Sequence, residues 1–169
     1  MNAQLAITAP HVTNQVSTIT NNIFDKSVTD TLINRVNQLT PTTQNHWGKM
    51  NVAQMLAHCN VTYEMTYEDK HPKPNAFVKF MLKIFVKPTV VGSKPYQKNG
   101  QTAPQFIIKG ARNFEVEKNR LVQYMKKTQE LGESHFHNTE SHSFGRLTKA
   151  EWSNMFYKHL DHHLNQFGV

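Results

Sequence analysis

Two histidines near the C-terminus have the spacing of metal ligands. His159 and His163 lie four residues apart in a stretch that also contains Trp152, Phe156 and Phe167. At about 100° per residue, these five side chains fall within about 80° of one another on a helix. The pattern predicts two imidazoles on the buried face of a helix, where polar groups need partners. Because side chains at i and i+4 emerge side by side one turn apart, both rings can bind one metal ion.

A metal ion held by this pair requires a ligand from another part of the chain. Zinc or nickel takes three or four protein ligands, and one helix face rarely supplies a third. His58 is the best candidate, because it lies in the middle of a predicted helix, on the flank of its apolar stripe. Three neutral imidazoles leave one coordination position open for water or substrate. His137 and His142, in the loop before the last helix, are candidates for a fourth ligand or a proton carrier.

A reading without a metal stays open at this point. The chain has ten histidines, which raises the chance that three of them meet a pattern by coincidence. His159 and His163 are then core or surface histidines with ordinary hydrogen-bond partners. His162 lies toward the edge of the stripe and Asp161 points away from it, so we expect His162 outside the metal site and Asp161 as a solvated charge. We expect Cys59 to be a small core residue rather than a catalytic thiol.

Other catalytic motifs are absent from the sequence. It contains no Gly-rich phosphate loop and no Gly-x-Ser-x-Gly nucleophile elbow. The metalloprotease pattern His-Glu-x-x-His is missing too, because the residue after His159 is Leu160. The last helix therefore carries no built-in general base, and no base can be named from the sequence.

Five helical segments are predicted to position these residues. Apolar residues recur at helical spacing in four of them, and the fifth is a short run with regularly spaced lysines. Asn51 is a good N-cap, Gly132 suits the position after a helix, and Thr148 with Glu151 forms a capping box. No segment alternates as a strand does. The predicted helices cover residues 27–39, 51–68, 76–87, 114–131 and a C-terminal stretch that starts after Thr148.

Two segments are predicted to connect the helices, and one short helix has an open role. Residues 88–113 form a long irregular connection, of the kind that crosses a bundle and shapes a pocket. Residues 133–146 form a histidine-rich loop. In the helix of residues 76–87, Lys79, Lys83 and Lys87 share one side. A basic amphipathic helix can lie on a membrane, but we expect this one to pack over the bundle with its lysines in water.

Length and charge limit the general class of the protein. With 169 residues we expect a mobile arm over residues 1–22 and one domain over residues 23–169. The formal net charge is +7, and we expect the lysines to be spread over the surface instead of clustered. We therefore expect neither a nucleic-acid nor a membrane partner. No apolar run is long enough to span a membrane, the start has no signal-peptide pattern and there is a single cysteine. These features favour the cytoplasm.

The sequence resembles the DinB-like superfamily, and within it a branch of domains of unknown function. The resemblance covers residues 23–169 and is carried by WGKMNVAQMLAHC at 47–59, FGRLTKAEW at 144–152 and YKHLDHHLNQFG at 157–168. It implies an all-α four-helix bundle with a long crossover connection, often dimeric. It also implies a divalent metal held by one histidine of the second helix and two of the last, which fall on His58, His159 and His163.

Two functional expectations follow from the residues and the resemblance together. The first is a metal-dependent transferase or hydrolase in which the ion activates a thiol or water for attack on a small molecule. Zinc or nickel fits an all-histidine site best, with manganese or iron as further candidates. Relatives in the superfamily include transferases that use low-molecular-weight thiols, although no thiol-binding motif can be matched here. The second expectation is a non-enzymatic metal-binding or interaction bundle.

Overall fold

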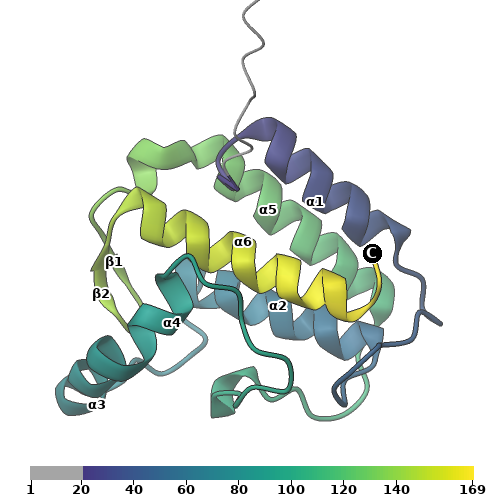
Figure 1. Cartoon of the computed structure of the whole chain (residues 1–169), viewed down its shortest axis with the longest axis horizontal. Helices are drawn as coiled ribbons and strands as arrows, with labels where there is room; N and C mark the ends of the chain where they lie inside the picture. Colours follow the sequence, from purple (N-terminus) through teal and green to yellow (C-terminus); the bar gives the residue numbers. More distant parts are fainter. Residues whose placement is uncertain (1–20) are drawn as a thin grey trace, which may run out of the picture.

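The computed structural model describes residues 21–169, and this part of the chain is mostly helical (Figure 1). The predicted arm over residues 1–22 lies outside the described residues except for its last two. The elements in chain order are α1 (Lys26–Gln38), α2 (Val52–Tyr67), α3 (Ala76–Met81), the π-helical turn η1 (Leu82–Val86), α4 (Lys87–Val91), the 3-10 turn η2 (Pro104–Phe106), α5 (Phe114–Phe136), β1 (Thr139–Ser141), β2 (Gly145–Leu147) and α6 (Lys149–Gln166).

The four long helices α1, α2, α5 and α6 share one hydrophobic core. α1 contacts α5 and α6, α2 contacts the same two helices, and α5 contacts α6. Fully buried side chains come from all four helices, for example Leu32, Leu56, Leu121 and Phe156. α1, α5 and α6 thus turn one face toward the core, as the helical periodicity predicted, whereas α2 is buried on nearly every side from Val52 to Tyr63.

The helix boundaries that carry caps agree with the sequence prediction. The Asn51 side chain accepts a hydrogen bond from the Gln54 backbone N–H, and the Asn51 backbone N–H donates to the Gln54 side chain, so that α2 begins with a capping box. Thr148 and Glu151 form the predicted capping box of α6. Farther along α2, the side-chain amide of Asn60 donates to the carbonyl and the carboxylate of Glu117 on α5. The caps thus fix the starts of α2 and α6, which carry the candidate ligands, and the Asn60 bonds hold α2 against α5.

α5 extends past the predicted end. Gly132 has φ 70° and ψ 174°, an extended conformation with positive φ that is open essentially to glycine alone. The chain nevertheless resumes helical hydrogen bonding and continues to Phe136, so Gly132 makes a kink instead of an end. Phe136 is buried and stacks on Phe24, and this packing accounts for the extra turn.

A short β-hairpin replaces the second half of the predicted histidine-rich loop. β1 and β2 pair antiparallel, with Thr139 opposite Leu147 and Ser141 opposite Gly145. Ser141 also donates to the Gly145 carbonyl, while Gly145 has φ 77°. The prediction of no strands was therefore wrong. Strands of three residues, with only the last side chain of each buried, are too short to show a period of two.

α3, η1 and α4 form one continuous helical segment over residues 76–91. The π-helical turn has a local cause, because Pro88 has no backbone N–H and its ring crowds the preceding turn. The Lys87 N–H accordingly bonds to the Leu82 carbonyl five residues back. The predicted helix of residues 76–87 was therefore too short by four residues.

The orientation of this segment differs from the prediction. Lys79 pairs with Glu140 of β1, and Lys87 pairs with Glu151 of α6 at 2.8 Å. The two lysines therefore face the rest of the protein, whereas large apolar side chains of α3 and η1 face water, Phe77 being 72% exposed. The expectation of a helix with its lysines in water was wrong in this respect.

No helix in residues 21–169 combines the length and the apolar character needed to cross a membrane. The all-α character of the described chain is otherwise as predicted, apart from the small hairpin.

Candidate metal centre

α2 and α6 bring His58, His159 and His163 together. One nitrogen from each ring lies within 4.8 Å of the other two. His58 and His163 are buried, while His159 keeps a partly exposed edge. Among the described residues this is the one group of three or more metal-ligating side chains that lie close enough to share an ion.

The outer nitrogen of each ring is occupied by an oxygen of the protein. His58 Nδ1 lies 2.8 Å from the carbonyl oxygen of Phe106, and His163 Nδ1 lies 2.8 Å from Oε1 of Gln166. His159 Nδ1 lies 2.9 Å from the hydroxyl of Thr62. Histidines that bind metals usually donate their other N–H to such an oxygen, which fixes the ring and its tautomer.

Hydrogen-bond accounting assigns the tautomers of two rings. A carbonyl oxygen only accepts, so His58 carries its proton on Nδ1 and has a free lone pair on Nε2. Gln166 donates its amide nitrogen to the Trp47 carbonyl at 2.6 Å, which turns its own oxygen toward His163. His163 therefore also carries its proton on Nδ1. Two of the three rings thus present bare Nε2 atoms to the centre of the cluster.

The third ring is held in the opposite tautomer by its neighbours. His159 Nε2 lies 2.9 Å from His58 Nε2, which accepts, so His159 donates from Nε2 and accepts at Nδ1 from the Thr62 hydroxyl. A hydroxyl can reverse its role from donor to acceptor. If the proton moved from Nε2 to Nδ1, His159 would therefore keep its hydrogen bond to Thr62 and its orientation.

The cluster keeps its imidazoles neutral. Burial lowers the pKa of His58, against the weaker opposing effect of the hydrogen bond to Phe106. Burial, followed by repulsion from His163 and His58, lowers the pKa of His159 well below its usual value. Burial and the proximity of His58 lower the pKa of His163 to about 3. Neutral imidazole is the form that binds metal ions.

The long connection of residues 88–113 supplies aromatic side chains to the centre. Phe106, in η2, lies edge-on to His159 at 5.7 Å and beside His58 at 5.3 Å between ring centroids. Tyr96 packs edge-on against both His159 and His162. This segment was predicted to shape a pocket, and it lies against the histidine cluster.

The other candidate residues lie outside the cluster. The His162 ring packs against His163 and Trp47. Asp161 pairs with Arg35 at 2.7 Å, so it is an ion-paired residue instead of the solvated charge that we expected.

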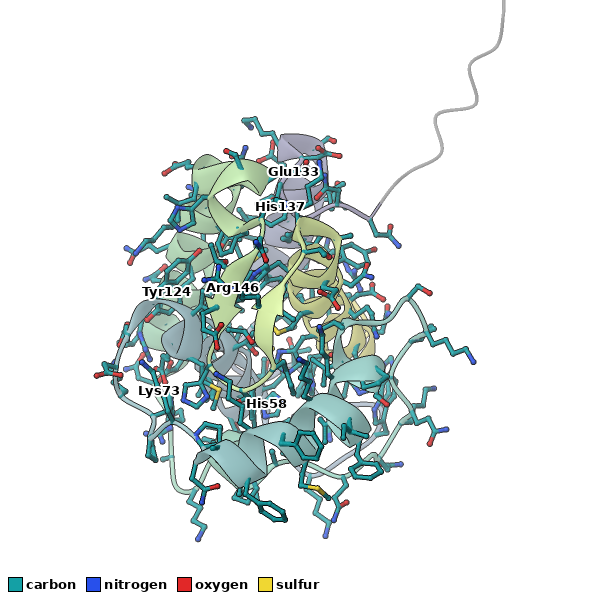
Figure 2. The ribbon with its side chains drawn as sticks, turned by 90° about the vertical axis from the view of Figure 1, so that its left-hand side faces the viewer. His58, Lys73, Tyr124, Glu133, His137 and Arg146 are labelled. Atoms are coloured by element: carbon teal, nitrogen blue, oxygen red, sulfur yellow. The ribbon has the colours of Figure 1, made fainter. Side chains whose placement is uncertain are left out.

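The two loop histidines are also placed elsewhere. His142 donates from Nε2 to the His71 carbonyl at 3.2 Å, and its Nδ1 bonds to the neighbouring Ser143 hydroxyl. His137 lies beside Glu133, well separated from His58 (Figure 2). Neither histidine joins the three candidate ligands, so the structure does not support a fourth ligand from this loop. Cys59 is buried, and burial raises the pKa of its thiol, as expected of a core residue.

An open groove of about 570 Å³ runs along the outer side of α6. His162 lies in its wall, but none of the three clustered histidines does. Its other walls include the aromatic residues Trp47 and Tyr96 and the charged residues Lys98 and Lys158. Tyr96 thus separates the groove from His159.

Several of these residues could not be read from the sequence. Gln166 was the easiest of them to predict, because it lies three residues after His163 on the same helix. Thr62 lies four residues after His58 and had a similar signal. Phe106 and Tyr96 lie in an aperiodic segment, where no sequence pattern indicated a contact with the histidines.

Comparison with known proteins places the chain in a family. No curated protein and no solved structure matches it. One family model matches residues 23–168, nearly all of the described chain, and this match includes the three candidate ligands. The chain therefore belongs to the family described as "Protein of unknown function (DUF1569)".

Proposed function

We propose that His58, His159 and His163 hold a divalent metal ion, and that the protein uses it in chemistry on a small molecule. The observation that carries the proposal is the pairing of every Nδ1 atom with a protein oxygen while the other nitrogens converge. Three unrelated core histidines have no reason to converge in this way. Zinc or nickel suits three neutral imidazoles best, and manganese or iron are further candidates.

The same proposal includes the architecture and the superfamily. We infer a DinB-like four-helix bundle of α1, α2, α5 and α6, in which residues 88–113 cross from one pair of helices to the other. The contacts of these four helices support the bundle. The second-helix and last-helix positions of the histidines support the DinB-like assignment. A homodimer is part of this proposal only through the resemblance, and a cytoplasmic location only through the features of the sequence given above.

The proposed chemistry is activation of a nucleophile. A divalent ion held by three neutral ligands supplies Lewis acidity, which lowers the pKa of a bound water or low-molecular-weight thiol. The residues of the chain orient the ligands: Phe106 and Gln166 hold two imidazoles as Nε2 ligands, and Thr62 accommodates the change of tautomer in the third. Phe106 and Tyr96 limit the access of water to His159. The reaction class is transfer or hydrolysis.

One observation favours the second candidate, a metal-binding bundle without catalysis. The groove beside α6 contains His162 in its wall but none of the three ligands. In such a protein the ion stabilises the pairing of α2 with α6 and acts on no substrate. Thiol-dependent conversion of an electrophile by the metal-loaded protein, lost in His159→Ala, would decide for the enzyme.

Metal binding is tested with untagged, full-length protein. We expect near-stoichiometric metal by elemental analysis, or a raised melting temperature after addition of zinc, nickel or manganese to chelator-treated protein. His163→Ala should abolish both effects, whereas His162→Ala, which removes a neighbouring imidazole outside the cluster, should leave them nearly unchanged. Equal effects of the two substitutions, or no metal in the parent protein, would contradict the proposal.

A further inference from the structure

α3 and η1 expose a group of large apolar side chains to water. Phe77, Phe80 and Phe85 are 72%, 58% and 67% exposed, and no residue of α3 or η1 is buried. Exposed apolar residues this numerous and this close together mark a binding surface in most proteins. We call this group the apolar face, which consists of Phe77, Val78, Phe80, Met81, Ile84, Phe85 and Val86.

The helical segment behind this face is held firmly at its C-terminal end. Lys158 of α6 donates to the carbonyl oxygens of Thr89 and Gly92, and Asn154 donates to that of Val91 at 3.0 Å. Val91 is itself buried. The N-terminal half projects beyond the four long helices (Figure 1), and side chains extend from it away from the rest of the protein (Figure 2). The apolar face is therefore presented by a fixed support.

Positive charge is concentrated in the part of the sequence that carries the apolar face, contrary to our expectation of evenly spread lysines. Residues 70–113 contain nine lysines and arginines and no aspartate or glutamate. The other 125 residues contain ten basic and twelve acidic residues. Lys83 and Lys94 are exposed, and neither forms an ion pair with a described residue. The net positive charge of the chain thus comes entirely from the segment that carries the exposed phenylalanines.

We propose that the apolar face binds the surface of an anionic lipid bilayer. Helices that lie in the membrane interface combine aromatic and aliphatic side chains, which enter the acyl boundary, with lysines that contact anionic headgroups. The apolar face provides the first component, and the exposed Lys83 within the same helical segment, with the other basic residues of 70–113, provides the second. This interaction is peripheral, and it is independent of the metal proposal.

Charge also argues against a second copy of the chain as the occupant. Two copies that met at this face would bring their acid-free segments together, and like charges oppose such contact. Acidic groups that could offset the repulsion, Glu140 and Glu151, already pair with lysines of the same chain. An anionic bilayer has the complementary charge and gains from burial of the phenylalanines.

Vesicle flotation tests this proposal with the untagged full-length protein. We expect the protein to float with vesicles that contain phosphatidylglycerol and to stay unbound with phosphatidylcholine alone. Combined substitution of Phe77, Phe80 and Phe85 by Ser should reduce binding at least about tenfold. Lys83→Glu with Lys94→Glu should weaken binding and its dependence on phosphatidylglycerol.

The matched control is Val116→Ser, which replaces an exposed apolar side chain of α5 outside the apolar face and should bind as the parent does. Unchanged melting temperatures would show that the variants fold. Failure of the parent protein to float, or equal flotation of the triple Ser variant, would overturn the proposal. A parent dimer that becomes monomeric in the triple Ser variant would overturn it in favour of a contact between copies.

Discussion

The histidine cluster and the apolar face treat their side chains in opposite ways. Between α2 and α6, two polar rings are buried and a third is largely shielded from water, and each outer nitrogen has a protein oxygen as partner. On α3 and η1, three phenylalanines are left in water without a partner among the described residues. Burial of polar groups and exposure of apolar ones both cost stability. The stability of the fold therefore does not explain the arrangement of either region.

The largest predicted effect contrasts the apolar face with the core that the four long helices share. Leu121→Ala, in the core shared by the long helices, should lower the free energy of unfolding by about 2–5 kcal/mol, because it leaves a cavity at a side chain that is 1% exposed. Phe80→Ala, although it removes more atoms, should change it by about 0.5 kcal/mol or less. Urea denaturation measures both. A loss for Phe80→Ala comparable to that for Leu121→Ala would show that the apolar face is packed in solution.

The next effect is the acid sensitivity of the metal-free protein. In the folded state the pKa values of His58, His159 and His163 are lowered, that of His163 to about 3. Between that value and about 6.5 the unfolded chain binds more protons, so stability is complete above about pH 6.5 and falls as the pH decreases. The limiting slope is about 1.4 kcal/mol per pH unit for each histidine involved.

Denaturation of chelator-treated protein across this pH range gives the slope. The His163→Ala variant should have a shallower slope than the parent. The triple Ser variant of Phe77, Phe80 and Phe85 should keep the parent slope, because the apolar face contains no titratable group. A parent stability that does not change below pH 6.5 would mean that the cluster is not buried in its neutral form.

The third prediction tests whether metal affinity depends on the orientation of the His163 ring as well as on its presence. Gln166→Leu keeps His163 but removes the oxygen that fixes its tautomer, so metal affinity should fall about 10–100-fold. Gln166→Glu retains an acceptor and should recover part of this loss. Gln123→Leu, at an exposed position of α5, is the control and should have no effect. Competition with a chromophoric chelator measures the affinities, and an unchanged affinity in Gln166→Leu would contradict the assigned role.

The sequence predicted the cluster better than it predicted the apolar face, for a physical reason. His159 and His163 lie on a helix with a clear apolar stripe, so helical phase separated them from His162 three and one positions away. The caps of α2 and α6 are local motifs, and they fixed the helix starts. His58 required the resemblance as well, because its flank position alone did not distinguish a ligand from an ordinary histidine.

Contacts between distant segments could not be predicted in this way. The position of Phe106 depends on the path of an aperiodic connection, and nothing local encodes it. In residues 76–91 the apolar residues occupy most sides of the helix, and the π-helical turn before Pro88 shifts the phase. Periodicity then identifies a helix without showing which side faces the core. Gly132 correctly indicated an interruption of the helix. The continuation to Phe136 depends on the burial of that side chain, which the local sequence does not reveal.

The smallest predicted effect concerns the contact between α3 and the hairpin. Lys79→Gln removes the ion pair with Glu140. The Lys79 and Glu140 side chains are both partly exposed. The free energy of unfolding should therefore change by less than about 1 kcal/mol. Because α3 has no buried residue, this contact should matter locally, and the amide hydrogens of residues 79–86 should exchange faster in the variant. Lys26→Gln, which breaks the exposed pair with Asp30 in α1, is the matched control and should leave those amides unchanged. Equal exchange in both variants would show that the anchorage of α4 on α6 alone holds the apolar face in place.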